Sequence, residues 1–124
     1  MIINAKNLQI LKTNFSNGRK HDFRLFKESK PVFHPSTVTQ SDTGYQGIQK
    51  IRKNSIIPYK KKRNVELTKA EKKFNHALSS KRIFVEHVIG RLKRFKIISE
   101  RYRNRRKRFG LRFNLIAGVY NFEL

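Results

Sequence analysis

The net charge of this chain limits what it can fold into more than any other feature of its sequence. Thirty Lys and Arg residues outnumber eight Asp and Glu residues, which gives a formal charge of +22 over 124 residues and a pI near 11.1. Such a charge opposes a compact state by self-repulsion, and a polyanionic partner relieves it. Nucleic acid is the commonest partner of this kind, so the charge predicts a nucleic-acid-binding protein.

Composition indicates a folded chain and not a disordered basic tail. Hydrophobic residues make up 37% of the sequence and aromatic residues 11%, including ten Phe, which is enough for a modest core in one domain. There is no cysteine, so disulfides and thiolate metal sites are excluded. The N-terminus lacks a signal-peptide pattern and no apolar run is long enough to span a membrane, so we expect a cytoplasmic protein without a membrane partner.

The first part of the chain predicts a hairpin and a short helix. Residues 2–5 and 8–15 are β-prone runs on either side of Asn7, and Asn tolerates the positive φ of a tight turn. Residues 22–29 predict a short helix that Pro31 stops.

The middle of the chain predicts a strand, a loop and an exposed segment. Residues 36–41 are polar and β-branched, and they lead into residues 42–47, where two glycines permit a sharp turn. Residues 50–63 are strongly cationic around Pro58, which predicts a segment exposed to solvent.

The last part of the chain predicts helices. Thr68 and Glu71 have the spacing of a capping box, so a helix begins there. Its pattern falters at residues 79–80 and resumes over 82–98, and residues 109–122 predict a final packing helix. The order of strand, strand, helix, strand and then mostly helix indicates an α/β fold class.

Glu86 is placed on the outer face of the helix over residues 82–98. The apolar residues of that helix fall in one arc: Phe84, Val85, Val88, Leu92 and Phe95. At about 100° per residue, Glu86 points almost opposite to the centre of this arc. Arg82, Gly90 and Lys93 share its face, so an exposed ion pair with Arg82 or Lys93 is the ordinary interpretation of Glu86.

Asp42 has two interpretations of equal weight. It ends the predicted strand before a glycine-containing turn, which is where α/β folds place ligand-facing groups. Asp before Gly also commonly hydrogen-bonds its own loop. Phosphodiester chemistry with divalent cations requires carboxylates from separate elements, and with only eight acids in the chain Asp42 and Glu86 are reasonable candidates.

Five segments of the sequence form a recognisable series. They are HDFRLF (21–26), DTGYQG (42–47), LTKAEKKFN (67–75), RIFVEHVIGRLK (82–93) and FNLIAG (113–118). In this order they closely resemble the DDE superfamily endonuclease domain of insertion-sequence transposases, in the group often called IS-five and related to the Harbinger-type nucleases. The resemblance covers essentially the whole chain.

The resemblance implies a fold, a reaction and a partner. The fold is RNase-H-like, with flanking helices and a mixed sheet that carries two aspartates, and a following helix carries a glutamate. By motif match, Asp42 takes the place of the second aspartate and Glu86 that of the glutamate, both as ligands of Mg²⁺ or Mn²⁺. The implied reaction is hydrolysis at the transposon end, followed by attack of the freed 3′-hydroxyl on target DNA. The implied location is the bacterial cytoplasm, on the nucleoid.

One departure from the family lowers what we expect of this chain alone. The family's first aspartate lies on a strand before the hairpin, and no residue here takes its place. We therefore expect an incomplete RNase-H-like fold, weak or absent metal binding and little or no activity. Within this partial catalytic domain we expect a sheet part (1–49), a basic linker (50–66) and a helical part (67–124). The uncovered hairpin edge predicts self-association, and a full-length transposase is another candidate partner.

Cationic residues around and after Glu86 are the candidates for binding DNA. They are Arg82, Arg91, Lys93, Arg101, Arg103, Arg105, Arg106, Lys107 and Arg108. We find no base-reading motif, so we expect weakly specific binding that falls with salt. His21 and Asp22 match a family segment to which no role transfers, and we interpret Asp22 as the cap of the short helix. We interpret His87 as a structural histidine.

Two other functions explain part of the pattern. A non-enzymatic basic protein that binds DNA or RNA accounts for the charge and the aromatic residues, but not for the ordered motifs. A regulator that binds DNA or the full-length enzyme without catalysis is the third. The discriminating feature is convergence of the Asp42 and Glu86 carboxylates, which a metal site requires and a simple binding protein does not.

Overall fold

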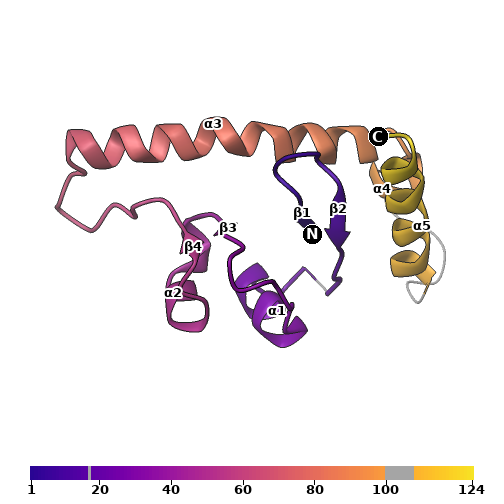
Figure 1. The fold of residues 1–124 in the computed structure, drawn as a ribbon, viewed down its shortest axis with the longest axis horizontal. Coiled ribbons are helices and arrows are strands. Elements are labelled where there is room, and N and C mark those ends of the chain that lie inside the picture. Colours follow the sequence, from indigo (N-terminus) through magenta and orange to yellow (C-terminus); the bar gives the residue numbers. More distant parts are fainter. Residues whose placement is uncertain (17, 100–107) are drawn as a thin grey trace. The chain divides into compact units, whose positions relative to one another are not determined.

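The computed structural model describes residues 1–16, 18–99 and 108–124, which belong to two compact units (Figure 1). The terminal unit comprises residues 1–15 and 81–124, and the central unit comprises residues 16–80. Helix α3 (Lys69–Leu92) contributes residues to both. Helices and short strands are both present, so the α/β fold class is confirmed. None of the helices formed by the described residues is long and apolar enough to span a bilayer.

The hairpin of the terminal unit is confirmed, although its strands are shorter than expected. Strands β1 (Ile2–Ile3) and β2 (Ile10–Lys12) pair antiparallel. The positive φ lies at Leu8 (61°) and not at Asn7, because the Asn7 side chain instead accepts a hydrogen bond from the Gln9 N–H at 3.1 Å. An Asn side chain that mimics a backbone turn is as effective as a left-handed Asn in reversing the chain.

Helix α5 (Phe109–Phe122) has the predicted bounds and packs on the hairpin and on the second half of α3. The buried core of the terminal unit consists of Ile10, Val88, Leu92, Ala117 and Tyr120. The apolar arc predicted for residues 82–98 is therefore only partly buried, since Phe84, Val85 and Phe95 are 52%, 39% and 43% exposed.

Asn121 of α5 joins the helix to strand β2. Its side-chain oxygen accepts from the Ile10 N–H at 2.9 Å, and its side-chain nitrogen donates to the Ile10 carbonyl at 2.8 Å. The Tyr120 hydroxyl donates to the Leu8 carbonyl at 3.2 Å. At Ile10 the edge of the hairpin is therefore covered by a helix, which is one way that proteins protect an unpaired strand.

Helix α3 is continuous where the sequence predicted an interruption. The capping box is confirmed, because Thr68 Oγ1 accepts from the Glu71 N–H at 3.2 Å and Glu71 accepts from the Thr68 N–H at 3.3 Å. The expected break at residues 79–80 is absent from this helix, since Ser80 satisfies its hydroxyl by donating to the His76 carbonyl at 3.1 Å. The helix ends at Leu92, and residues 96–99 form the separate helix α4 (Lys96–Ser99).

The central unit contains a parallel strand pair with a helical crossover. Strand β3 (Thr39–Gln40) pairs with β4 (Ser55–Ile56), and the connection holds the 3₁₀ helix η1 (Thr43–Tyr45) and helix α2 (Ile48–Ile51). Helix α1 (Asp22–Ser29) has the predicted bounds. The described residues form two two-stranded sheets, one antiparallel (β1 and β2) and one parallel (β3 and β4).

The sequence predicted that the segment over residues 50–63 is exposed to solvent, and the structure shows that part of it is buried. Ser55 and Pro58 are buried, because β4 pairs with β3 and the chain after it passes against the start of α3. Pairing of β4 with the distant strand β3 therefore decides the burial of this segment, and the cationic residues around it do not.

The core of the terminal unit is tested by a matched pair of truncations. Leu92→Ala is expected to lower the free energy of unfolding by roughly 2 to 5 kcal/mol, because Leu92 is 2% exposed. Leu115→Ala removes the same atoms from a side chain that is 62% exposed, and a change under about 0.5 kcal/mol is expected. Urea denaturation followed by circular dichroism measures both, and equal losses would contradict this core.

Candidate functional site

Asp42 lies immediately beyond the carboxyl end of the parallel pair. Strand β3 ends at Gln40, the Ser41 N–H donates to the Ile56 carbonyl at 3.1 Å, and Asp42 then caps η1. Its Oδ1 accepts from the Gly44 N–H at 2.9 Å, and the residue is half-buried. Both interpretations of Asp42 are thus compatible in one residue, since it stabilises its own turn at the position where α/β folds present ligands.

The N-terminus of α1 lies beside the Asp42 turn. A Cβ added at Gly44 would lie 3.0 Å from Asp42 Oδ1 and 3.3 Å from His21 Cε1, so both side chains crowd the same point. Only glycine fits between them without displacing one of them. The HD and DTG segments, which are twenty residues apart in the sequence, therefore meet in the central unit.

The cap of α1 is His21, which corrects the prediction that Asp22 caps this helix. The His21 backbone is extended, and its Nδ1 accepts from the Phe23 N–H at 3.2 Å. Asp22 is the first helical residue, where its charge favours the positive end of the helix dipole. Because Nδ1 acts as an acceptor, the proton of the neutral imidazole is assigned to Nε2, which lies 3.6 Å from the added Cβ position at Gly44.

Tyr45 is affected by two carboxylates of the central unit, Asp22 and Asp42, which the sequence did not indicate. Its ring packs against those of Phe23 and Phe26, with centroids 5.4 and 5.8 Å apart. Burial raises the pKa of the Tyr45 phenol, and the negative charges of Asp22 and Asp42 raise it further. Asp22, Asp42 and Tyr45 are thus one electrostatic group in the sense that both carboxylate charges act on the phenol, and carboxylate oxygens are of the kind that hard cations bind.

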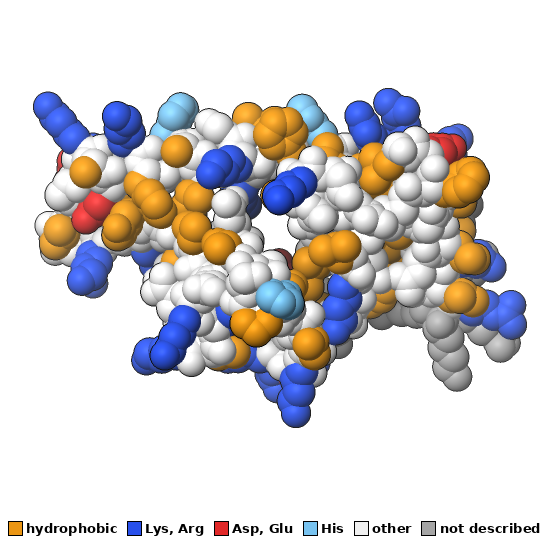
Figure 2. All heavy atoms as spheres, in the orientation of Figure 1, with side chains coloured by type: hydrophobic (Ala, Val, Ile, Leu, Met, Phe, Trp, Pro, Cys, Tyr) orange, Lys and Arg blue, Asp and Glu red, His pale blue; other side chains and the backbone are white. Residues whose placement is uncertain are grey.

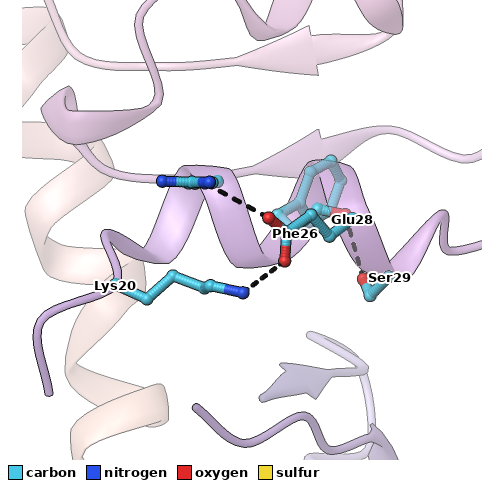
Figure 3. Close-up of polar contacts among 5 residues, drawn as sticks. Lys20, Phe26, Glu28 and Ser29 are labelled. Carbon is cyan, nitrogen blue, oxygen red and sulfur yellow. Dashed lines mark hydrogen bonds and ion pairs between the residues drawn. The ribbon is translucent and has the colours of Figure 1, made fainter. Parts of the chain in front are cut away.

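Glu28 is excluded from this group by its own ion pairs (Figure 3). Lys20 Nζ lies 2.5 Å and Arg24 Nε 3.2 Å from its two oxygens. The hydrogen bond from Lys20 is the largest cause that holds the pKa of Glu28 below its usual value. Ser29 closes the same helix by donating to the Phe26 carbonyl at 2.9 Å. Glu28 therefore holds α1 together and is not a candidate ligand.

Glu86 is exposed on α3, as predicted, and belongs to the terminal unit, whereas Asp42 belongs to the central unit. Within the described part of the chain, the ion pairs join Lys20 and Arg24 to Glu28 and Lys61 to Glu66, and Glu86 is in none of them. The interpretation of Glu86 as half of a surface ion pair with Arg82 or Lys93 stays a prediction. His87 has a structural contact, since its ring meets that of Phe84 edge-on at 6.4 Å.

No cluster of three or more His, Asp or Glu side chains with metal-binding geometry occurs among residues 1–16, 18–99 and 108–124. The sequence had predicted a pair of carboxylates and not a triad.

The candidate DNA-binding cations are only partly described. Arg82, Arg91 and Lys93 are exposed, and Lys93 follows the last residue of α3. Arg108 is exposed at the start of α5. Five further candidates lie outside the described residues: Arg101, Arg103, Arg105, Arg106 and Lys107. Lys and Arg side chains project widely over the face seen in Figure 2, where few acidic side chains are visible.

Comparison with known proteins identifies the class. The family described as DDE superfamily endonuclease matches residues 1–121, and the chain belongs to this family. Over all 124 residues it is 51% identical to the probable transposase for insertion sequence element IS702 of Microchaete diplosiphon. It spans 45% of that protein's length. No solved structure matches the chain.

The electrostatic group around Tyr45 makes a prediction for alkaline pH. Because its folded-state pKa lies above the ordinary value of 10.0, the neutral phenol contributes stability that is fully present below about pH 10 and is lost as pH rises through the folded-state pKa. Asp42→Asn and Asp22→Asn should each lower the pKa of Tyr45, while burial, the largest cause, keeps it above 10.0.

The measurement is a titration of the Tyr45 ¹³Cζ resonance in the unmodified chain and in each variant. Glu66→Gln removes an exposed acid of the same unit and is the control, which should leave the pKa of Tyr45 unchanged. If Asp42→Asn leaves the pKa of Tyr45 unchanged, the charge of Asp42 does not act on the Tyr45 phenol.

Proposed function

We propose that this chain is part of the catalytic domain of an insertion-sequence transposase and supplies it with two metal-binding carboxylates, Asp42 and Glu86. The observation that carries this is the position of Asp42 directly after a parallel strand, beside the α1 terminus, in a chain of the DDE endonuclease family. The relative that is 51% identical is a probable transposase by name. The RNase-H-like fold and the IS-five subgroup belong to the same proposal.

The donor set of the central unit fits a hard divalent cation. Asp42 is fixed in direction, because the Gly44 N–H holds one of its oxygens. The negative charges of Asp22 and Asp42 both act on Tyr45 and raise the pKa of its phenol. Mg²⁺ or Mn²⁺ prefers such oxygen donors and, when bound, neutralises charge at the attacking and leaving oxygens of a phosphodiester.

The exposed cations of α3 supply the other half of the function. Arg82 lies one turn before Glu86 on the same helix, Arg91 lies further along the helix, and Lys93 follows its end. Charges on a helix surface around a metal ligand suit the phosphate backbone of a DNA strand. We propose that they hold transposon-end or target DNA while the carboxylates position the metal.

A chimera tests the catalytic proposal. The chain replaces the matching 45% of the Microchaete diplosiphon protein, and transposition of a marked element is scored in cells. Asp42→Asn and Glu86→Gln are each expected to reduce it by roughly a hundredfold or more, because a metal ligand contributes several kcal/mol to the transition state.

Glu66→Gln, at an exposed acid outside the proposed site, and the unmodified relative are the controls and should retain activity. A chimera in which Asp42→Asn transposes as well as the unmodified chimera contradicts the proposal. A chimera that binds element DNA but never transposes, beside an active parent, favours the non-enzymatic DNA-binding or RNA-binding function.

Salt dependence tests DNA binding by the chain itself. The logarithm of the association constant for duplex DNA should fall linearly with the logarithm of salt concentration, by about 0.9 for each phosphate neutralised. Replacing Arg82, Arg91 and Lys93 together by Ser should reduce this slope by roughly 3. Filter binding or fluorescence anisotropy at several salt concentrations measures it, with Lys6→Gln as a single-charge control, and a slope near zero in the unmodified chain would rule out phosphate binding.

A further inference from the structure

A groove of about 780 Å³ lies entirely within the central unit and has no role in the proposed metal site. Its walls come from the segment that follows β4, from the first turns of α3 and from the loop that follows η1. The residues that matter below are Gln46, Tyr59, Phe74 and the basic run 60–63. Figure 2 shows hydrophobic side chains gathered along the first half of α3, with Lys and Arg side chains beside them.

Two aromatic rings form the apolar part of the groove. Tyr59 is 51% exposed and Phe74 is 39% exposed, and their centroids lie 5.3 Å apart with the planes at 64°. An edge-to-face pair of this kind is stable by itself and leaves ring faces open to solvent. Exposed rings at the wall of a groove offer a flat surface on which another π-system can stack.

The position of Tyr59 is fixed by its backbone and not by its ring. Asn75 accepts from the Tyr59 N–H at 2.7 Å and donates to the Tyr59 carbonyl at 2.9 Å. The preceding residue, Pro58, is buried. The groove is therefore preorganised, and the Tyr59 side chain can be changed without removing the contacts that hold the segment against α3.

Positive charge follows the aromatic pair directly. Residues 60–63 read Lys-Lys-Lys-Arg, and all four are exposed. Within the described residues, Lys61 pairs at 4.0 Å with the exposed Glu66, and the other three are in no ion pair. These exposed side chains are available to an external anion. Gln46, four residues after Asp42, also lines the groove, so the groove adjoins the turn that carries Asp42.

We propose that this groove binds an unpaired segment of a DNA strand, with a base stacked on the Tyr59 ring, which Phe74 supports edge-on, and with phosphates held by Lys60, Lys62 and Arg63. This rests on the proposed function for its choice of DNA. Aromatic platforms beside a cationic track are how proteins bind single strands, because every base has a π-face while a duplex keeps its bases stacked inside. An acidic peptide would use the cations and have no need of the rings.

The test measures binding of the whole 124-residue chain to a fluorescent dT oligonucleotide and to a duplex of equal length. Tyr59→Leu should weaken binding of the single strand by roughly 5-fold to 100-fold, the value of one stacked base, and leave duplex binding within about twofold. Tyr59→Phe keeps the ring and should retain binding. Phe122→Leu, at a side chain that is 92% exposed in the other unit, is the matched control and should change neither affinity.

Three outcomes would overturn the proposal. The first is that Tyr59→Leu binds the single strand as tightly as the unmodified chain does, with duplex binding intact. This would exclude single-strand binding by the groove and leave the proposed function unaffected. The second is that the chain binds no DNA even at low salt, which would exclude both the groove proposal and the proposed function. A poly-Glu peptide that competes for the groove as well as the oligonucleotide does, and whose affinity falls equally in Tyr59→Leu, identifies an acidic protein as the ligand.

Discussion

Electrostatic repulsion among 30 Lys and Arg side chains is the constraint that the rest of this structure has to overcome. Against it stand small apolar cores, such as the packing of Val88 of α3 with Ile10 of the hairpin. Both units add the same polar contact, in which a helix asparagine binds the N–H and carbonyl of one extended residue. Asn121 does this for Ile10, and Asn75 does it for Tyr59. A neutral amide satisfies these backbone groups without adding charge.

Elements whose ends depend on local chemistry were predictable from the sequence. Helix α1 stops before Pro31, and the Thr68 and Glu71 side chains start α3 as their spacing indicated. Strand β4 was missed, because its two residues lie inside a cationic run and form a strand only by pairing with the distant β3. The expected break at residues 79–80 failed for a related reason, since a hydroxyl that can interrupt a helix can also bond within it.

The candidate site was predictable in position but not in environment. The sequence located Asp42 at the end of a strand and Glu86 on an exposed helical face, and the structure has both there. It did not indicate that His21 crowds Gly44, or that Tyr45 responds to two carboxylates, because these contacts depend on how α1 packs against η1. Tertiary packing of this kind leaves no periodic signal in a single sequence.

The central claim is that Asp42 and Glu86 bind the same divalent cation. Paramagnetic broadening of backbone amide signals by substoichiometric Mn²⁺ tests it directly in the 124-residue chain, since even weak binding broadens nearby signals. The proposal predicts that the signals around Asp42 and those around Glu86 broaden together, and that Asp42→Asn abolishes both effects. Broadening at one carboxylate alone, or at Glu86 in the Asp42→Asn variant, would contradict a shared metal site.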